Sequence, residues 1–406
     1  MSSSVAPYVD ASTREGGARR FSRRTLLKRA GIGAGAVAVV SAGGLAWRIV
    51  DQGVLAPGSG IAYEPWQARL TGDGPLSLVR AATLAANAHN TQPWLFRIGP
   101  DRIDLFADRE RSMGALDPLG RELEISLGCA LENLLRAAPA NGFAASLTLL
   151  PDPSEPDHIA GIDLRPGSTV TDPLFEAIPR RHTDRGPYAV GMGVDGAFEE
   201  LSSLADDDNV TLTWLRADPD MATFARLTVE ATEAIVAASD QARDDFAWYR
   251  QDWGEIQRRK DGITMDAAGL PEPTRLLVRI LPSSDRATLQ QGWVDATRDR
   301  HVATAAAFGL ISVQDAADTG LRIGAGRLFQ RIHLASTTRN LALQPLNQVF
   351  ERTDAEIVEG NHPSFTDAVA ALAPSDRQAI TAFRIGHPTG TPNLSPRRPA
   401  EEVLVG

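Results

Sequence analysis

Two amphipathic segments in different parts of the chain resemble each other, and this internal similarity limits the fold more than any other feature. Residues 128–138 can be laid on residues 326–336, with Leu131 matching Phe329 and Leu134 matching Ile332. Apolar residues recur in both at the spacing of a helix with one buried face, and each segment precedes a strand-like run. Amphipathic helices often look alike, so the similarity is a first indication of two related halves.

The length of 406 residues is large for one ordinary domain and suits two, each with its own core. Helices that bracket short strands favour an α+β fold. The chain is divided as follows: an N-terminal signal or anchor over 1–52, a Pro/Gly-rich linker over 53–74, a first half over 75–171 and a second half over 172–406.

Hydrophobic periodicity predicts the main elements. Helices are expected at 76–87, 121–138, 197–204, 221–238 and about 320–343. Strands are expected at 94–98 and 102–106, joined as a hairpin, and at 146–150, 158–164, 210–215, 301–313 and 383–386.

Charge and residue usage exclude several classes of protein. The formal net charge is −10, and residues 1–29 hold seven basic and two acidic side chains, so the rest of the chain carries −15. An acidic body argues against nucleic-acid binding and against an anionic membrane face beyond the N-terminus. The only lysines are Lys28 and Lys260, so a phosphate site must use arginine. The single cysteine, Cys129, allows no disulfide framework and no thiolate metal site, and it is expected in the core.

The N-terminus has the pattern of an export signal. Arg23 and Arg24 stand in a Ser-Arg-Arg-x-x-x-Lys frame before an apolar run from Ala30 to Val50 whose only charge is Arg48. This frame resembles a twin-arginine signal, which predicts export by the twin-arginine machinery to the periplasm or another extracytoplasmic space. Whether the segment is cleaved stays open, because about 20 apolar residues can also anchor a protein in a bilayer.

A glycine-rich sequence within this run matches the residue pattern of the dinucleotide-binding fingerprint but not its structural context. Gly31, Gly33 and Ala36 satisfy G-x-G-x-x-A. The fingerprint requires a preceding strand, whereas a basic signal region precedes these residues. The match is therefore rejected.

A polar loop over residues 86–94 carries the first functional motif. It reads Ala-Asn-Ala-His-Asn-Thr-Gln-Pro-Trp, between a predicted helix and a predicted strand. Asn90 and Gln92 offer amide donors and acceptors that suit a ribityl chain or a pyrimidine edge, and Pro93 stiffens the turn.

An arginine-rich segment over residues 180–185 carries the second motif. Arg181, Thr183 and Arg185 alternate, so in an extended segment all three can face one ligand, and His182 lies between them. Two further stretches come later in the chain. They are Gln344 with Pro345 after the long helix, and a C-terminal tail with Arg397 and Arg398 after the strand 383–386.

These segments together resemble motifs of the nitroreductase superfamily, over about residues 75–405, and are closest to the Acg-type branch, which joins two nitroreductase-like halves in one chain. The loop resembles the family's P-S-x-x-N-x-Q-P-W, with Ala86 and Asn87 in place of Pro-Ser. The second motif resembles R-[HR]-S-x-[RK], which grips the FMN phosphate and the pyrimidine side of the flavin. The resemblance implies FMN as cofactor, with no metal, and chemistry that FMN carries. The implied cofactor-binding residues are Asn90, Thr91, Gln92, Pro93, Trp94, Arg181, His182, Thr183, Arg185, Gln344, Pro345, Arg397 and Arg398.

The distribution of the motifs implies one flavin site per chain. In ordinary family dimers one subunit supplies the arginine element and the other supplies the loop. Here the first half keeps only the loop and the second half keeps only the arginine element. The resemblance therefore implies a monomer, in which the two halves form a pseudo-dimer that holds one FMN.

An aromatic-rich stretch over 244–293 interrupts the second half. It contains Trp248, Tyr249, Trp253 and Trp293 in a chain with only 6% aromatic residues. It is either ordinary helix packing or a lid over the flavin.

Two functions stay open. One is an FMN oxidoreductase that passes electrons to a nitro, quinone or similar small-molecule acceptor. The other is a catalytically silent protein that binds or sequesters FMN under a lid. A purely structural role would make the motifs remnants.

Overall fold

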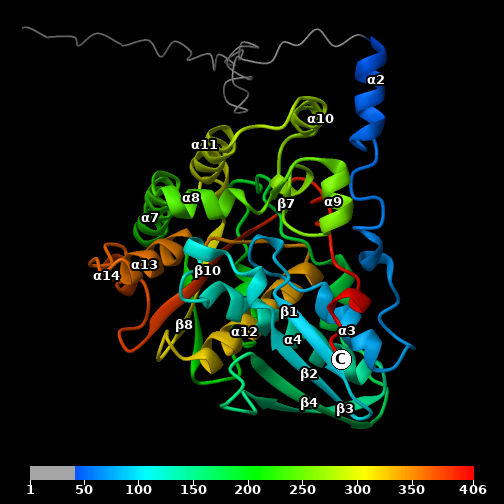
Figure 1. Ribbon diagram of the computed structural model, residues 1–406. Coiled ribbons are helices and arrows are strands. Elements are labelled where there is room, and N and C mark those ends of the chain that lie inside the picture. Colours follow the sequence, from blue (N-terminus) through cyan, green and yellow to red (C-terminus); the bar gives the residue numbers. More distant parts are fainter. Residues whose placement is uncertain (1–41) are drawn as a thin grey trace, which may run out of the picture.

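The computed structural model describes residues 42–406 (Figure 1). Arg23, Arg24 and most of the apolar N-terminal run lie outside the described residues. Within residues 42–406, no helix is both long enough and apolar enough to cross a bilayer.

The first half contains a four-stranded antiparallel sheet of order β1-β2-β4-β3. The strands are β1 (Trp94–Ile98), β2 (Arg102–Ala107), β3 (Phe143–Leu149) and β4 (His158–Pro166). The predicted hairpin is confirmed, since Trp94 pairs with Ala107 and Ile98 pairs with Ile103. The helices are α3 (Pro75–Thr83) and α4 (Arg121–Ala140).

The second half contains another four-stranded antiparallel sheet, of order β5-β8-β10-β9. Its strands are β5 (Val210–Leu215), β8 (Ala307–Val313), β9 (Ala342–Pro345) and β10 (Gln378–Gly386). In both sheets the second strand pairs with the first and the fourth, and the third lies at an edge. In both, a 20-residue helix precedes the third strand: α4 in the first half and α12 (Thr319–Thr338) in the second. The structure thus shows the α+β class, with one connectivity occurring twice.

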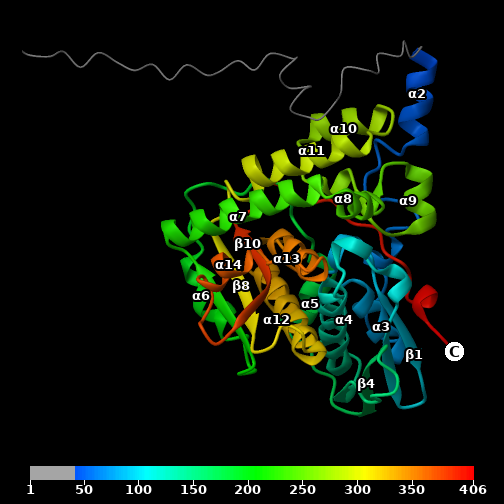
Figure 2. The same cartoon turned by 60° about the vertical axis from the view of Figure 1, so that its left-hand side comes forward.

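The helices α4 and α12 pack against each other at the centre of the molecule (Figure 2). A Cβ atom on Gly128 would lie 2.2 Å from the Ile323 carbonyl oxygen, and one on Gly326 would lie 2.1 Å from the Ile125 carbonyl oxygen. Only glycine permits this approach of the two backbones. The contact is reciprocal, because each glycine meets the residue three positions before the other glycine.

A long connection between β5 and β8 covers the space above the two sheets. It spans residues 216–306, and its helices lie together above the sheets in both views (Figures 1 and 2). Its elements are α7 (Asp218–Ala237), α8 (Ser239–Phe246), β6 (Tyr249–Arg250), α9 (Trp253–Arg259), β7 (Ile263–Thr264), α10 (Glu272–Ile280) and α11 (Arg286–Ala296). The remaining helices are α2 (Ala42–Asp51), α5 (Pro173–Ala177), α6 (Asp195–Ser202), α13 (Gln348–Val358) and α14 (Thr366–Ala370).

Several sequence-based boundaries are wrong. The strands expected to begin at 146 and 383 begin at Phe143 and Gln378. The strand expected at 301–313 begins at Ala307, because residues 297–301 extend α11 as a π-helical turn. The helix expected to reach 343 ends at Thr338, where Asn340 takes a left-handed φ of 55° and turns the chain into β9. The helix expected at 76–87 ends at Thr83. Hydrophobic periodicity does not register such turns, since the flanking apolar residues continue.

Residues 53–74, expected to be a linker, pack against the body of the protein. They contain a 3-10 helix, Glu64–Gln67, and both Tyr63 and Trp66 are buried. The Trp66 indole N–H donates to the Ser395 carbonyl at 2.7 Å. Glycine and proline predict irregular backbone here but give no information about its tertiary contacts.

Candidate functional site

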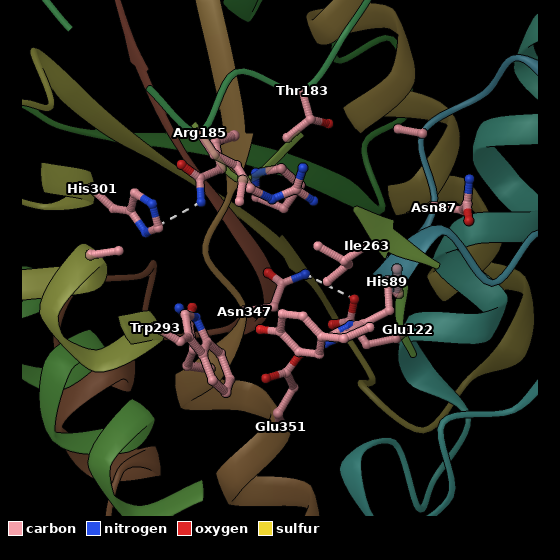
Figure 3. A pocket seen from close by; sticks show the side chains of 18 of the residues that line it. Asn87, His89, Glu122, Thr183, Arg185, Ile263, Trp293, His301, Asn347 and Glu351 are labelled. Carbon is pink, nitrogen blue, oxygen red and sulfur yellow. Dashed lines mark hydrogen bonds between the residues drawn. The ribbon is translucent and has the colours of Figure 1, made fainter. Parts of the chain in front are cut away.

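A cavity of about 220 Å³ lies where the two halves and the long connection meet (Figure 3). The first half contributes Asn87, His89, Glu122 and Cys129; the second half contributes Thr183, Arg185, Gln344, Pro345, Asn347 and Glu351; the connection contributes Tyr249, Ile263, Trp293, Arg300 and His301. Four predicted residues therefore line the cavity: Thr183, Arg185, Gln344 and Pro345.

The long connection forms one wall of this cavity. Tyr249, Leu270, Val278, Leu289 and Trp293 line it, all within the aromatic-rich stretch 244–293. These side chains are aromatic or aliphatic, so this wall is largely apolar. Such a wall limits the access of water to whatever the cavity holds.

Two buried arginines lie together beside the cavity without an acidic partner. Arg181 is 1% exposed and Arg397 is 3% exposed. Arg181 Nη2 donates to the Leu84 carbonyl at 3.0 Å, and Arg397 Nη2 donates to the adjacent Ala85 carbonyl at 3.2 Å. Within residues 42–406, neither guanidinium has a carboxylate within salt-bridge distance, and the Nε atom of each lacks a hydrogen-bond partner. A buried charge is costly unless it is paired, so a bound anion would offset the charge of these two arginines.

His182 and Trp66 complete this basic cluster. The Trp66 ring lies 4.9 Å from the Arg397 guanidinium and its centroid lies 4.5 Å from that of His182. The His182 Nδ1 atom is buried without a partner. The basic cluster consists of Arg181, His182 and Arg397. The ring of Trp66, from the segment that was expected to be a linker, packs against it.

The electrostatics of the basic cluster show that its charges are uncompensated. Burial lowers the pKa of Arg181 to about 10. Burial and the positive charges of Arg181 and Arg185 hold the pKa of Arg397 well below its usual value. Burial, with the two guanidinium groups, lowers the pKa of His182 to about 3, so this imidazole is neutral. A bound anion would oppose all three effects.

Arg384 holds the cavity-lining segments in place. Its Nε donates to Gln344 Oε1 at 2.7 Å, its Nη2 donates to the Gly186 carbonyl at 2.7 Å, and its guanidinium lies 3.8 Å from the Tyr188 ring centroid. It joins β10 to the segment that carries Thr183 and Arg185. Arg384 is thus a positioning residue that the sequence motif did not single out.

The loop 86–94 supports the basic cluster rather than lining the cavity with its motif residues. Asn90 Nδ2 donates to the Pro396 carbonyl at 2.8 Å, and Asn90 Oδ1 accepts from Arg397. Gln92 Oε1 accepts from the backbone N–H of Arg398 at 2.8 Å, and Gln92 Nε2 donates to the Lys260 carbonyl at 2.8 Å. The loop therefore fastens the C-terminal tail and positions Arg397.

The remaining predicted residues are also structural in this arrangement. Arg398 Nη2 donates to the Gln92 carbonyl at 2.6 Å and Nη1 lies 3.7 Å from Asp108. The Thr91 hydroxyl donates to the Ala88 carbonyl at 2.9 Å, Pro93 precedes β1, and Trp94 is fully buried in the core. Arg398 is set apart from the basic cluster because its Nη2 donates to the loop carbonyls of Gln92 and Trp94, while its buried Nε has no partner within residues 42–406.

Cys129 is buried, as predicted. Its Sγ donates to the Gly326 carbonyl at 3.3 Å, and burial raises the pKa of its thiol. A thiol in this state is a poor nucleophile. Within residues 42–406, no group of His, Cys, Asp and Glu side chains is arranged to hold a metal ion.

Sequence reasoning missed a second set of polar residues around the cavity: Glu122, Arg300, His301, Asn347 and Glu351. They come from three separate segments, and none stands in a motif. Asn347 alone has a local signal, since it follows Gln344 and Pro345 closely.

Comparisons with known proteins identify relatives over most of the chain. No protein-family model matches it. A Mycobacterium tuberculosis protein named as an NAD(P)H nitroreductase, Acg, is 28% identical over 351 residues, which are 82% of this chain and 96% of that protein. A second protein of that organism named as an NAD(P)H nitroreductase is 38% identical over 145 residues, which are 35% of this chain and 42% of that protein.

Solved structures give weaker matches. The FMN-dependent nitroreductase NfnB of Mycobacterium smegmatis, in complex with NADPH, is 14% identical with a TM-score of 0.36, covering 57% of this chain and 96% of that one. A nitroreductase of Anabaena variabilis is 11% identical with a TM-score of 0.37, covering 83% of this chain and 91% of that one. These scores are too low to carry a conclusion about this chain. The alignment with Acg covers 82% of this chain and nearly the whole length of that protein, so the similarity extends over most of both sequences.

Proposed function

We propose that the protein is an FMN-binding oxidoreductase of nitroreductase type. The observation that carries the proposal is the basic cluster, in which Arg181 and Arg397 are buried together and have no carboxylate within salt-bridge distance among residues 42–406. A terminal phosphate supplies the missing charge, and guanidinium groups bind phosphate with paired hydrogen bonds. The cluster borders a cavity with a largely apolar wall, as a flavin ring requires.

The residues divide into two groups around the cofactor. Arg181, His182 and Arg397 would hold the phosphate, and Thr183, Arg185, Gln344 and Pro345 would face the remainder of the cofactor from the cavity wall. When bound, FMN supplies hydride transfer to a nitro, quinone or similar acceptor. The positive charge of Arg185 stabilises negative charge in the cavity, and the apolar wall excludes water.

A second candidate, a protein that holds FMN without turnover, is favoured by the wall itself. Trp293, Tyr249 and Leu289 line one side of the cavity, and a nicotinamide would have to displace this wall to reach a flavin from that side. Anaerobic addition of NADPH to the purified yellow protein separates the two functions. Bleaching of the flavin, followed by reoxidation with a quinone, is expected for the enzyme. A flavin that stays oxidised under NADPH but is reduced by dithionite would favour the holding function.

We further propose that the chain arose by tandem duplication and binds one FMN as a monomer. The repeated strand order and the reciprocal contacts of Gly128 and Gly326 support duplication, since a two-fold relation makes each partner contact the other's equivalent. In this alignment Gly324 and Arg327 of α12 correspond to Ser126 and Cys129 of α4, and they line a second, polar depression together with Asp206 and Arg331.

The arginines of that depression are already neutralised. Arg327 pairs with Glu132 at 3.0 Å, and Arg331 pairs with Asp206 at 2.6 Å. A phosphate there would compete with carboxylates, which favours a single flavin site. Light scattering with flavin quantitation tests this; two FMN per chain, or binding only in a dimer, would contradict the proposal.

Export by the twin-arginine route is part of the proposal and rests on Arg23 and Arg24. Their replacement by two lysines keeps the charge but removes the signal. The variant is expected to stay in the cytoplasm in a fractionation experiment.

A further inference from the structure

A buried carboxyl group that belongs to no predicted motif lies in the cavity wall. Glu351, in the first turns of α13, is 5% exposed and lines the cavity. Its Oε2 atom is buried without a hydrogen-bond partner. Figure 3 shows the side chain rising from α13 into the cavity, near Asn347 and Trp293.

The charged groups around Glu351 are mostly acidic, and the nearby cation Arg121 pairs with other carboxylates through Nη1 and Nε, while its buried Nη2 has no partner within residues 42–406. Arg121 Nη1 contacts Glu122 Oε1 at 2.6 Å, and Arg121 Nε contacts Asp354 Oδ2 at 2.8 Å. Asp245, on α8, is paired with His89 at 3.0 Å. None of these interactions gives Glu351 a counterion.

This environment favours the neutral acid. Burial raises the pKa of Glu351 well above its usual value, the negative charges of Glu122, Asp245 and Asp117 raise it further, and Arg121 opposes them. The positive N-terminal end of α13 also favours the carboxylate, but this effect is weaker than the desolvation of an unpaired charge. Tyr249, on β6, also lines the cavity together with Glu122 and His89, and burial keeps Tyr249 neutral by raising its pKa.

From this geometry we propose that Glu351 donates a proton to the acceptor molecule. In this role its side chain is a carboxylic acid at neutral pH. The inference rests on the proposed oxidoreductase function. Reduction of a quinone adds a hydride equivalent, which the reduced cofactor supplies, and one proton to oxygen. The O–H bond of Glu351 breaks as the new O–H bond of the product forms, and the resulting carboxylate regains its proton from water. A carboxylic acid in an apolar wall suits this role because it can donate at pH 7.

The protonation state can be measured without turnover. Infrared difference spectra between the wild-type protein and Glu351→Gln at pH 7 should contain the carbonyl band of a protonated carboxyl group. The matched control is Glu359→Gln, a more exposed glutamate of the same region that pairs with Arg352; its difference spectrum should show a carboxylate instead. Absence of the protonated band from the Glu351→Gln difference would overturn the proposal.

The donor role is tested by single turnover. Protein reduced anaerobically with dithionite is mixed with a quinone, and Glu351→Gln should slow reoxidation by about 10²–10⁴-fold, the usual contribution of a general acid. Its flavin content should match that of the wild type, and Glu351→Asp should recover part of the rate. An unchanged rate in Glu351→Gln would exclude the role. If Glu351→Gln does not fold, Glu351→Leu serves both measurements.

Failure of the proposed function gives a different result. A wild-type protein that binds no flavin would contradict the oxidoreductase assignment, and with it the donor role. The infrared measurement on that protein would still report whether Glu351 is protonated.

Discussion

The two halves use the same strand order but connect their first two strands very differently. Residues 99–101 join β1 to β2, whereas residues 216–306 join β5 to β8. The short connection contributes nothing to the cavity, and the long one forms its apolar wall. One connection between neighbouring strands therefore decides whether a sheet only supports the site or also encloses it.

The halves also differ in whether the amide and guanidinium groups of their motifs have hydrogen-bond partners. In the first half, the side chains of Asn90 and Gln92 are hydrogen-bonded to the tail and to the connection. In the second half, Arg181 is buried with an unpartnered Nε, and Arg397 of the tail shares this state. Unpaired buried polar groups mark where a ligand is expected, and paired ones mark support. The following experiments test this contrast.

The largest effect is expected from removing both arginines of the basic cluster. The double variant Arg181→Ala/Arg397→Ala should lower FMN affinity roughly 10³–10⁴-fold, since bonds to charged groups contribute about 2–3 kcal/mol each. Flavin fluorescence titration measures the dissociation constant. The control is Arg180→Ala, which removes the exposed neighbour of Arg181 and should not change it. Full flavin retention in the double variant would contradict the proposal that these two arginines bind the FMN phosphate.

The reciprocal helix contact predicts two matching losses of stability. Gly128→Ala and Gly326→Ala should each lower the free energy of unfolding by about 1–3 kcal/mol, because the new Cβ would overlap a facing carbonyl oxygen. Urea denaturation measures the effect. Gly196→Ala on α6 is the control, since its Cβ would meet no atom within 4 Å. Strongly unequal losses would argue against a symmetric crossing.

Arg181→Met should separate stability from binding. Replacing an unpaired buried charge with an apolar side chain of similar length should raise the stability of the flavin-free protein by about 1 kcal/mol. The same change should weaken FMN binding. Thermal unfolding of the flavin-free protein measures the first effect, and a fall in melting temperature would show that Arg181 mainly stabilises the fold.

The smallest effect concerns the pH dependence of stability. Burial and the neighbouring guanidinium groups lower the pKa of His182 from its ordinary value of 6.5 to about 3 in the folded protein. The unfolded chain therefore binds the extra proton between these values, and stability is lost as the pH falls below 6.5, by at most about 1.4 kcal/mol per pH unit. His182→Gln should reduce this slope in urea unfolding measured at pH 6.5 and 5.5. The control His362→Gln, at an exposed position, should keep the wild-type slope.

The sequence by itself determined the features that depend on local periodicity and residue type. The hairpin of β1 and β2, the strand β5 and the helix α4 follow from apolar spacing, because their side chains alternate or recur around a buried face. Because lysine is scarce, any anion site had to use arginine. The alternation of Arg181, Thr183 and Arg185 predicted that this segment faces a ligand.

Only the tertiary structure decided which of those residues are left without partners. Arg397 and Arg398 are neighbours in the sequence, yet one joins the basic cluster and the other binds the loop carbonyls. Trp66 and Glu351 belong to no motif, and long-range packing alone brings them to the site. The physical reason is that burial and hydrogen-bond satisfaction depend on contacts between segments far apart in the sequence, such as Asn90 and Arg397, which are separated by 307 positions.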